Sequence, residues 1–494
     1  MKLLKISLRI APFLVLFLCA ISAAPAQDQF GKLFTVNDSG DSRDAVPGNG
    51  VCLDASGKCT VRAAIEEANS APDQDAIIFD LPGNVIIDLS LGELVISSNL
   101  YIIGPSARKL FIQRIHSAST NFRVFHVTPN AGVSINLRGF SISHGQAARG
   151  GGIYIESGNI VNLTELAIHS NSAEVGGAIA NAGTLNMTRS SLSSNAALTT
   201  LGNGASLGGG LINLDASSKA TISNSTLTMN TSTSGGGIFN NGTLILVNNT
   251  LTNNGATVRG ASIANEPGGV VSVLNTIIGR DLFSSSLAGA FVSLGNNIIT
   301  DARNSSGFTN GVGGDQVSND NAINPLLGAF SYNGGETLNF PLLDGSPAIN
   351  QGNSCVFTGG CPAPVPSNLA LRYDQRKNYS RRADNAIDVG AVEYNAGILT
   401  SRTSIGFISG RARRSGASVI LTRITTNEKQ YQIANPFGNF RIQNIIDLDP
   451  YILEIKSKRA GQSSIFVLEF DKVFPIFPIR PDPFFSEIEL SEQR

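Results

Sequence analysis

A repeated, glycine- and asparagine-rich unit in the middle of the chain restricts the fold more than any other feature. Copies that open with two or three glycines begin at Gly150, Gly176, Gly208 and Gly235, and a looser copy begins at Gly260. Repeats of roughly 20 to 50 residues are typical of solenoids and related arrays. We therefore expect the chain to stack similar units rather than to fold around one compact centre.

Apolar residues keep their position from copy to copy. Successive apolar anchors are separated by 26, 32, 27 and 25 residues, which suits one coil of three short strands with loops of varying length; the anchors are Ile153, Ile179, Leu211, Ile238 and Ile263. Apolar and polar residues alternate between them, which predicts one buried and one exposed face per strand. No copy can bury its apolar face alone, but copies stacked at roughly 4.8 Å share one core. We predict an all-β chain whose residues 81–323 form a right-handed parallel β-helix, a pectate-lyase-like solenoid.

Four asparagines recur at the same place after the second strand of their copies: Asn171, Asn195, Asn230 and Asn254. Stacked amides can hydrogen-bond from coil to coil, and we interpret this column as a structural ladder. Ligand binding by the same amides is the alternative. The glycine pairs are interpreted as turns that need positive φ or close backbone approach, because a phosphate loop would need a following helix.

The overall charge gives no indication of a partner. The chain has 36 Lys and Arg against 37 Asp and Glu, so no net field steers it to nucleic acid or to an anionic membrane. Only 15% of its residues are charged, and small polar residues must supply much of the surface. This composition is common among secreted repeat proteins rich in β-structure.

Residues 1–26 are interpreted as a secretory signal peptide. Lys2, Lys5 and Arg9 supply the positive region before an apolar run, and Ala24-Pro25-Ala26 fits the small-residue cleavage pattern. We expect a mature chain without a transmembrane segment, secreted or held at the cell surface.

The four remaining cysteines fall into two pairs that are close in sequence, Cys52 with Cys59 and Cys355 with Cys361. Two local disulfides are the simplest assignment for an oxidising compartment. A metal site is the weaker alternative, since neither pair has zinc-knuckle spacing and no histidine lies within either loop.

The N-terminal part is expected to cap the stack, because an exposed end of a parallel stack invites aggregation. The segment from Thr60 to Ser70 places apolar residues on one helical face. The stretch from Phe34 to Asn69 resembles the CSLREA-type N-terminal segment of bacterial surface and secreted proteins, with Thr-Val in place of Ser-Leu and Ala in place of Glu in the motif. We assign residues 27–80 to this cap.

At the other end, the stretch Asn324–Asn353, the triplet Asp374–Arg376 and the stretch Ile387–Tyr394 together resemble a choice-of-anchor Q domain. The resemblance implies that residues 324–396 close the β-helix and that an anchor follows, although no sorting motif is evident.

Residues 400–475 change in character. Segments beginning at Ser409, Asn435 and Tyr451 are similar to carboxypeptidase regulatory-like domains, which are small β-sandwiches. The resemblance implies an accessory module without catalysis, followed by a tail over residues 476–494.

A search for chemistry yields no catalytic site. Glycoside hydrolysis needs two facing carboxylates, and the coils between 111 and 300 hold few acids: Glu156, Glu165, Glu174, Asp215, Glu266 and Asp281. Ser143-His144-Gly145 resembles one polygalacturonase motif without its companions, so His144 is interpreted as a turn or surface residue. Gly204–Gly208 matches a nucleophile elbow, but no histidine follows His169.

No cofactor is expected. Calcium is the one ion that the sequence allows, through Asp38, Asp41 and Asp44, with Asn37 and Asp54 nearby. The spacing misses the EF-hand loop, so a solvated acidic turn is the favoured interpretation. The absence of Trp, and of Tyr between Tyr154 and Tyr332, argues against a sugar cleft along the coils.

Three hypotheses follow for function. The first is a non-enzymatic surface or secreted protein, a stiff rod that displays loops such as Ala196–Gly208 for adhesion or envelope interaction, with polysaccharide or surface proteins as partners. The second, by analogy of fold alone, is a polysaccharide lyase or glycoside hydrolase. The third is a module of a larger envelope assembly that docks through its C-terminal sandwich.

Overall fold

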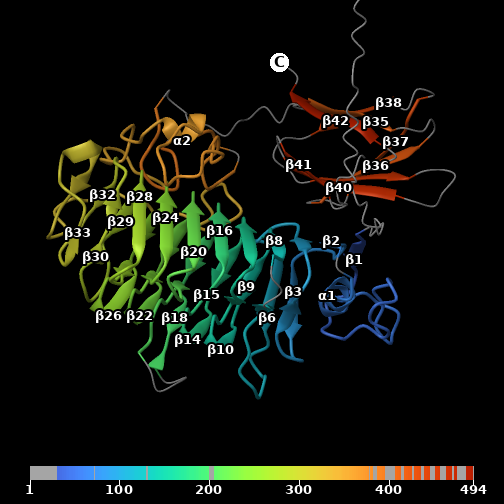
Figure 1. Cartoon of the computed structure of the whole chain (residues 1–494), viewed down its shortest axis with the longest axis horizontal. Helices are drawn as coiled ribbons and strands as arrows, with labels where there is room; N and C mark the ends of the chain where they lie inside the picture. Colours follow the sequence, from blue (N-terminus) through green and yellow to red (C-terminus); the bar gives the residue numbers. More distant parts are fainter. Residues whose placement is uncertain are drawn as a thin grey trace, which may run out of the picture.

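The computed structural model in Figure 1 describes residues 31–394, apart from 72, 129–131, 200–204, 378 and 382–385, together with strands between 406 and 492. The predicted signal peptide lies outside the described residues. Figure 1 shows a long stack of parallel strands, a small helix at its N-terminal end and a separate pair of sheets formed by the C-terminal residues.

The stack is built from four parallel sheets, and we name them A to D. Sheet A contains β1 (Leu33–Val36), β2 (Asp75–Phe79), β5 (Leu100–Ile103), β8 (Ser134–Arg138), β12 (Ile160–Thr164), β16 (Thr184–Thr188), β20 (Lys219–Ser223), β24 (Thr243–Val247), β28 (Val270–Leu274) and β31 (Val292–Ser293). Sheet B contains β3 (Val85–Leu89), β6 (Leu110–Arg114), β9 (Ser141–Ser143), β13 (Ala167–His169), β17 (Ser191–Ser193), β21 (Thr226–Thr228), β25 (Thr250–Thr252), β29 (Ile277–Gly279), β32 (Ile298–Ile299) and β34 (Gln316–Val317).

Sheet C contains β4 (Leu94–Ile96), β7 (Phe125–Val127), β11 (Ile153–Ile155), β15 (Ile179–Asn181), β19 (Leu211–Asn213), β23 (Ile238–Asn240), β27 (Ile263–Asn265), β30 (Leu287–Ala290) and β33 (Ser305–Ser306). Sheet D is shorter and contains β10 (Gln146–Arg149), β14 (Ser172–Val175), β18 (Ala196–Ala197), β22 (Thr231–Ser234) and β26 (Gly255–Arg259). A regular coil passes through A, B, D and C in turn, so it has four strands where we had expected three.

The register confirms the predicted parallel β-helix. The apolar anchors pair directly from coil to coil, Ile153 with Ile179, Ile179 with Leu211, and onward to Ile238 and Ile263. All five are fully buried, in one apolar core that runs through the coils. Each coil therefore buries the face that it cannot bury alone.

The turns explain the glycines and much of the polar sequence. Gly235 has φ of 67°, and a Cβ atom there would lie 2.4 Å from the carbonyl oxygen of Ile238, so this sharp turn from sheet D to sheet C accepts no side chain. The turns from A to B and from B to D instead place a non-glycine residue in the left-handed region, such as Asn224 (φ 46°) or Ser194 (φ 55°). Short polar side chains tolerate this conformation best.

Residues 324–394 lie along the flank of the stack rather than over its open end alone, which differs from the expected closure. Asn275 Nδ2 donates to the carbonyl of Asn353 at 3.0 Å, and Asn224 Nδ2 donates to the carbonyl of Tyr373 at 2.7 Å. Ser106, several coils earlier, donates to Glu336. The reason is local: the left-handed turn residues present their amides outward, and the segment uses these amides as partners.

The C-terminal residues form two antiparallel sheets, a small sandwich. One sheet has the order β38 (Asn439–Ile445), β35 (Gly406–Ala412), β42 (Phe485–Glu492); the other has the order β37 (Lys429–Ile433), β36 (Ser418–Arg423), β39 (Tyr451–Lys456), β40 (Ser463–Glu469), β41 (Lys472–Pro475). Phe440 from the first sheet and Leu421 from the second are both buried. Because β42 pairs with β35 along its length, the tail expected over 476–494 supplies a strand of the sandwich, which corrects that boundary.

The helices are few and short. Those that lie wholly within the described residues are α1 (Val61–Asn69), α2 (Cys355–Thr358) and a 3₁₀ turn at Val312–Gly314. Helix α1 begins where the side chain of Thr60 accepts a hydrogen bond from the Ala63 amide, and its buried residues include the predicted Ala64 and Ile65. Within the described ranges, no helix has the length and apolarity needed to cross a bilayer.

Candidate functional site

The first coils of sheet C carry a polar cluster on their outer face. In β4, β7 and β11 the first and last residues point into the core, so the central residues Val95, His126 and Tyr154 face outward and pair in register. Glu93 precedes β4 and Glu156 follows β11. Coil stacking thereby brings together residues that are 33 and 30 positions apart in the chain.

The imidazole of His126 joins the two carboxylates. Its Nδ1 lies 2.8 Å from Oε1 of Glu93, and its Nε2 lies 2.8 Å from Oε1 of Glu156. Tyr154 stacks on the imidazole with ring centroids 5.3 Å apart, and Arg123 lies 5.0 Å from the centre of the tyrosine ring. Arg123 Nε is also 3.4 Å from Glu93 Oε2. We call these five residues the His126 cluster.

The pKa shifts in the His126 cluster reflect these contacts. Burial alone would lower the pKa of His126, but hydrogen bonds to Glu93 and Glu156 outweigh burial and raise the pKa above 6.5. Burial alone would raise the pKa of Glu93, but His126 and Arg123 bring the pKa below its ordinary value. With the imidazole protonated, two positive groups balance two negative groups.

This arrangement favours a fixed polar surface over a catalytic pair. The two carboxylates share one outer face, as hydrolysis of a glycosidic bond requires. The imidazole, however, stands between them and uses both of its nitrogens, which leaves no place there for a water or a sugar oxygen. His126 as an imidazolium is also a donor on both sides and has no lone pair to act as a base.

The other three histidines form a column on the outer face of sheet B and its turn. His144 lies 4.2 Å from His116 and 6.4 Å from His169, measured between ring centroids. His144 has φ of 61° and occupies the left-handed position of its turn, as interpreted from the sequence. Burial, and then the neighbouring His116, lower its pKa; burial, and then His144, lower that of His169.

Buried charges near residues 324–394, which we call the flank segment, have structural partners. Glu165, fully buried, lies 3.1 Å from Arg138, 3.1 Å from Arg189 and 3.8 Å from Lys377. Burial opposes its ionisation, but these cations hold its pKa well below the ordinary value. These contacts join three successive coils, those of β8, β12 and β16, to the flank segment.

The stretches Asp374–Arg376 and Ile387–Tyr394 meet through hydrogen bonds, and each contributes to a buried ion pair. Asp374 pairs with Arg376 at 2.6 Å, Glu393 pairs with Arg381 at 2.6 Å, and the amide of Glu393 donates to Asp374 at 3.0 Å. Arg381 reaches Asn224 of the coils at 2.6 Å. The motif residues therefore fasten the segment to itself and to the stack.

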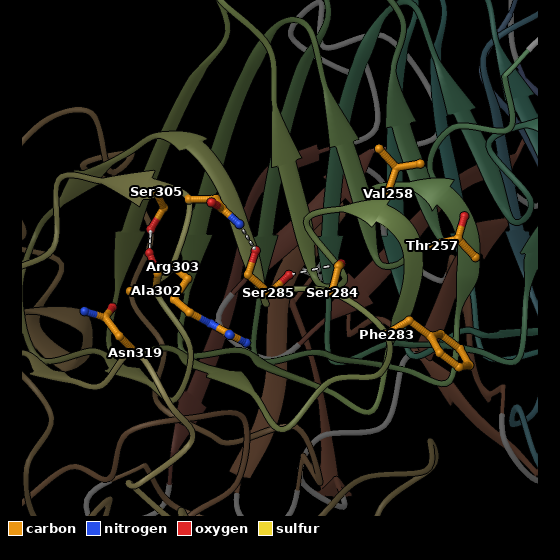
Figure 2. A pocket seen from close by; sticks show the side chains of 10 residues that line it. Thr257, Val258, Phe283, Ser284, Ser285, Ala302, Arg303, Ser305 and Asn319 are labelled. Carbon is orange, nitrogen blue, oxygen red and sulfur yellow. Dashed lines mark hydrogen bonds between the residues drawn. The ribbon is translucent and has the colours of Figure 1, made fainter.

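A hollow of about 710 Å³ opens on the outer surface where sheet D ends (Figure 2). It is lined by Thr257, Val258, Phe283, Ser284, Ser285, Ala302, Arg303, Asn304, Ser305 and Asn319. Asn304 Nδ2 donates to Ser285 Oγ at 3.2 Å across its floor. Most of these lining residues carry hydroxyl, amide or guanidinium side chains, and one carries an aromatic ring.

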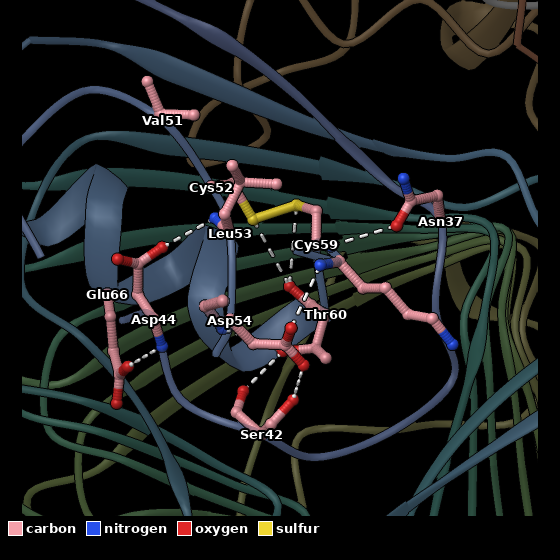
Figure 3. The surroundings of a disulfide bond; sticks show 12 residues. Asn37, Ser42, Asp44, Val51, Cys52, Leu53, Asp54, Cys59, Thr60 and Glu66 are labelled. Atoms are coloured by element: carbon pink, nitrogen blue, oxygen red, sulfur yellow. Dashed lines mark hydrogen bonds between the residues drawn. A yellow bond between two sulfur atoms is a disulfide. The ribbon is translucent and has the colours of Figure 1, made fainter. Parts of the chain in front are cut away.

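The acidic residues proposed for calcium are each engaged by partners within the protein, and Figure 3 shows Asp44 and Asp54 with theirs. Asp38 pairs with Lys58 at 2.8 Å, and Asp41 pairs with Arg62 at 2.7 Å. Asp44 accepts from the amides of Val46 and Leu53, and Asp54 accepts from Ser42, Ser56 and the Lys58 amide. Among the described residues no group of three or more His, Cys, Asp or Glu side chains is placed to hold a metal ion.

The structure brings the other predicted residues together in pairs and columns. Cys52 is bonded to Cys59, and Cys355 to Cys361. The four ladder asparagines stand in one buried column, where each Nδ2 donates to the next Oδ1: Asn171 to Asn195 (3.1 Å), Asn195 to Asn230 (3.0 Å) and Asn230 to Asn254 (3.0 Å). Residues 200–204 of the expected display loop, and with them part of Gly204–Gly208, lie outside the described residues.

Sequence reasoning missed three features, two buried ladder contacts and one surface cluster. A fifth member of the column is an aspartate, Asp281, whose Oδ1 accepts from the Asn254 amide at 2.9 Å. A second buried ladder joins Asn181, Asn213, Asn240 and Asn265 at the ends of the sheet C strands. The His126 cluster would have been visible as polar residues spaced by about one coil length, had the spacing of the anchors been carried upstream.

Comparison of the chain with protein-family models, curated proteins and solved structures found no match.

Proposed function

We propose that this chain is an exported β-helix protein that acts by binding, in adhesion, display or envelope interaction, and not by catalysis. The observation that carries the proposal is the state of the His126 cluster. It is the place in the described coils where two carboxylates and a histidine face outward together. The imidazole fills the space between the acids and, together with Arg123, balances their charge.

The proposal includes location and family. Two disulfides in the chain agree with an oxidising, extracytoplasmic compartment. The resemblances to a CSLREA-type cap, a choice-of-anchor Q segment and a carboxypeptidase regulatory-like sandwich support a bacterial secreted or surface protein. Under this proposal the β-helix is a stiff scaffold, and its outer faces and loops contact partners.

A polysaccharide hydrolase or lyase is the second candidate, because Glu93 and Glu156 do share one face. For this candidate the imidazole must leave its place when substrate binds. Substituting His126 by Ala would then expose both acids, and Glu93→Gln would abolish turnover.

The test is a panel of neutral and acidic polysaccharides incubated with the mature chain, with binding and product release measured on the same samples. The proposal expects retained binding without new reducing ends or unsaturated uronates. Products that appear with the wild type and disappear with Glu93→Gln would establish the second candidate instead. A chain lacking residues 400–494 that stays at the cell surface would exclude docking through the sandwich.

A further inference from the structure

The hollow of Figure 2 exists because the coils change at this point. Strand β26 is the last strand of sheet D, and the next coil continues the pairing by a single bridge between Gly255 and Leu282. The chain then turns through Phe283 toward β30. The coils after β26 have no sheet D strand to cover this side of the stack, and the hollow lies where that cover ends.

Phe283 stands at the edge of this hollow, where its side chain is little buried and its backbone is strained. Its side chain is 80% exposed, so the ring gains little from burial. Its φ is 74°, in the left-handed region that disfavours bulky side chains. Backbone strain and an exposed aromatic ring at the same residue are typical of a binding position.

The neighbouring strand fixes where the ring lies. A Cβ atom on Gly255 would lie 3.1 Å from Cδ2 of Phe283, so the ring rests against the backbone of β26. The residues paired with Gly255 along sheet D carry side chains at this position: Ser172, Ala196 and Thr231. The chain thus has glycine at the one rung where the ring needs the space.

Arg303 presents a second flat group to the hollow. Its Nε and Nη2 donate to the two carboxylate oxygens of Asp301 at 2.9 and 2.6 Å, which holds the guanidinium in one plane. The Arg303 side chain is 59% exposed while Asp301 is buried. Because the charge is balanced by this carboxylate, the hollow attracts no strong anion. The remaining polar lining offers hydroxyls and amides.

We propose that this hollow binds a neutral polysaccharide, with a sugar ring stacked on Phe283 and its hydroxyls bonded to the amides and hydroxyls around Asn304 and Asn319. The C–H groups on one face of a pyranose carry partial positive charge and suit the negative face of an aromatic ring. The volume lies within the roughly 300–1,000 Å³ typical of ligand sites, while the polar lining disfavours an apolar ligand. This inference rests on the proposed binding function and gives it a ligand class.

The experiment is calorimetric titration of the mature chain with neutral glucan, mannan and xylan oligosaccharides, and with oligogalacturonate as the acidic comparison. Phe283→Asn removes the ring and suits a positive φ, and Gly255→Thr keeps the ring but displaces it. Both should weaken binding of the preferred neutral sugar at least tenfold, about 1.4 kcal/mol. Phe283→Tyr should bind within about threefold of the wild type, since a change that small is well under 1 kcal/mol. Tyr431→Ala, which removes another exposed ring, should change nothing.

Thermal melting separates loss of the site from loss of the fold. Phe283→Asn should melt at or above the wild-type temperature, because it relieves backbone strain. Unchanged affinity in Phe283→Asn would overturn the site while leaving a binding function intact. Preference for oligogalacturonate, or no binding of any neutral sugar at millimolar concentration, would overturn the ligand class. Cleavage of the sugars would instead contradict the proposed function.

Discussion

Replacing Asn230 by Ala should destabilise the β-helix more than any single truncation on its outer face. Asn230 is fully buried in the middle of the ladder. Its Oδ1 accepts from the amide and the side chain of Asn195 at 3.1 and 3.0 Å. Its Nδ2 donates to the carbonyl of Leu192 at 2.9 Å and to Oδ1 of Asn254 at 3.0 Å.

The magnitude follows from what the substitution leaves behind. The Asn195 amide would be a buried donor without its acceptor, which costs about 1–3 kcal/mol. The three other hydrogen bonds contribute about 0.5–1.5 kcal/mol each. Together these terms predict a loss of roughly 2.5–7.5 kcal/mol from the free energy of unfolding.

The assay is denaturant unfolding followed by far-ultraviolet circular dichroism, because the chain has no tryptophan for fluorescence. Asn186→Ala is the matched control: Asn186 donates to Asn162 at 3.0 Å in a similar column, but it is exposed on sheet A. The Asn186→Ala variant should lose no more than about 0.5 kcal/mol of its free energy of unfolding. Equal losses for Asn186→Ala and Asn230→Ala would refute the reasoning, since burial would then not decide the cost.

The remaining predictions concern titration and turns. Proton resonances of His126 should titrate above 6.5 and those of His144 below 6.5, and the reverse order would contradict the assigned contacts. Burial, against hydrogen bonds from Ser and backbone donors, raises the pKa of Asp281 to about 7, so the contribution of this group to stability should fall as pH rises from about 4 to 7, because only the unfolded state ionises there. Asp281→Asn should flatten that slope, whose full size is on the order of 4 kcal/mol; an unaltered slope in unfolding experiments would disprove the assignment. Gly235→Ala should lower the free energy of unfolding by well over the roughly 1 kcal/mol expected for Gly268→Ala. Both glycines have positive φ, but only Gly235 lacks room for a Cβ atom, so similar melting temperatures for the two variants would count against this prediction.

The period of the apolar anchors was enough to predict the fold, because residues that repeat at this period occupy the same position in successive coils. Ile179 and Leu211, for example, pair in register one coil apart. The same period predicts the first asparagine ladder. The predicted ladder ends at Asn254, because the next member is an aspartate, Asp281, with the same geometry.

The candidate sites were harder to predict because they depend on register between coils of unequal length. No glycine pair marks the coils of Glu93 and His126, so nothing in the local sequence indicates that they meet. The distribution of Trp and Tyr argues against a sugar platform, but it says nothing about an exposed phenylalanine such as Phe283. The sequence predicts a tail where β42 lies, because pairing with β35, some 80 residues earlier, leaves no periodic signal.

The most direct test of the account is the fate of a bound sugar. A neutral oligosaccharide that binds the mature chain would be held with it at saturation for a day, released by denaturation and weighed by mass spectrometry. We expect the sugar to be recovered at its original mass, and Phe283→Asn to retain far less of it. Recovery of shorter products, lost on substituting Glu93 by Gln, would contradict the central claim that this β-helix binds without catalysis.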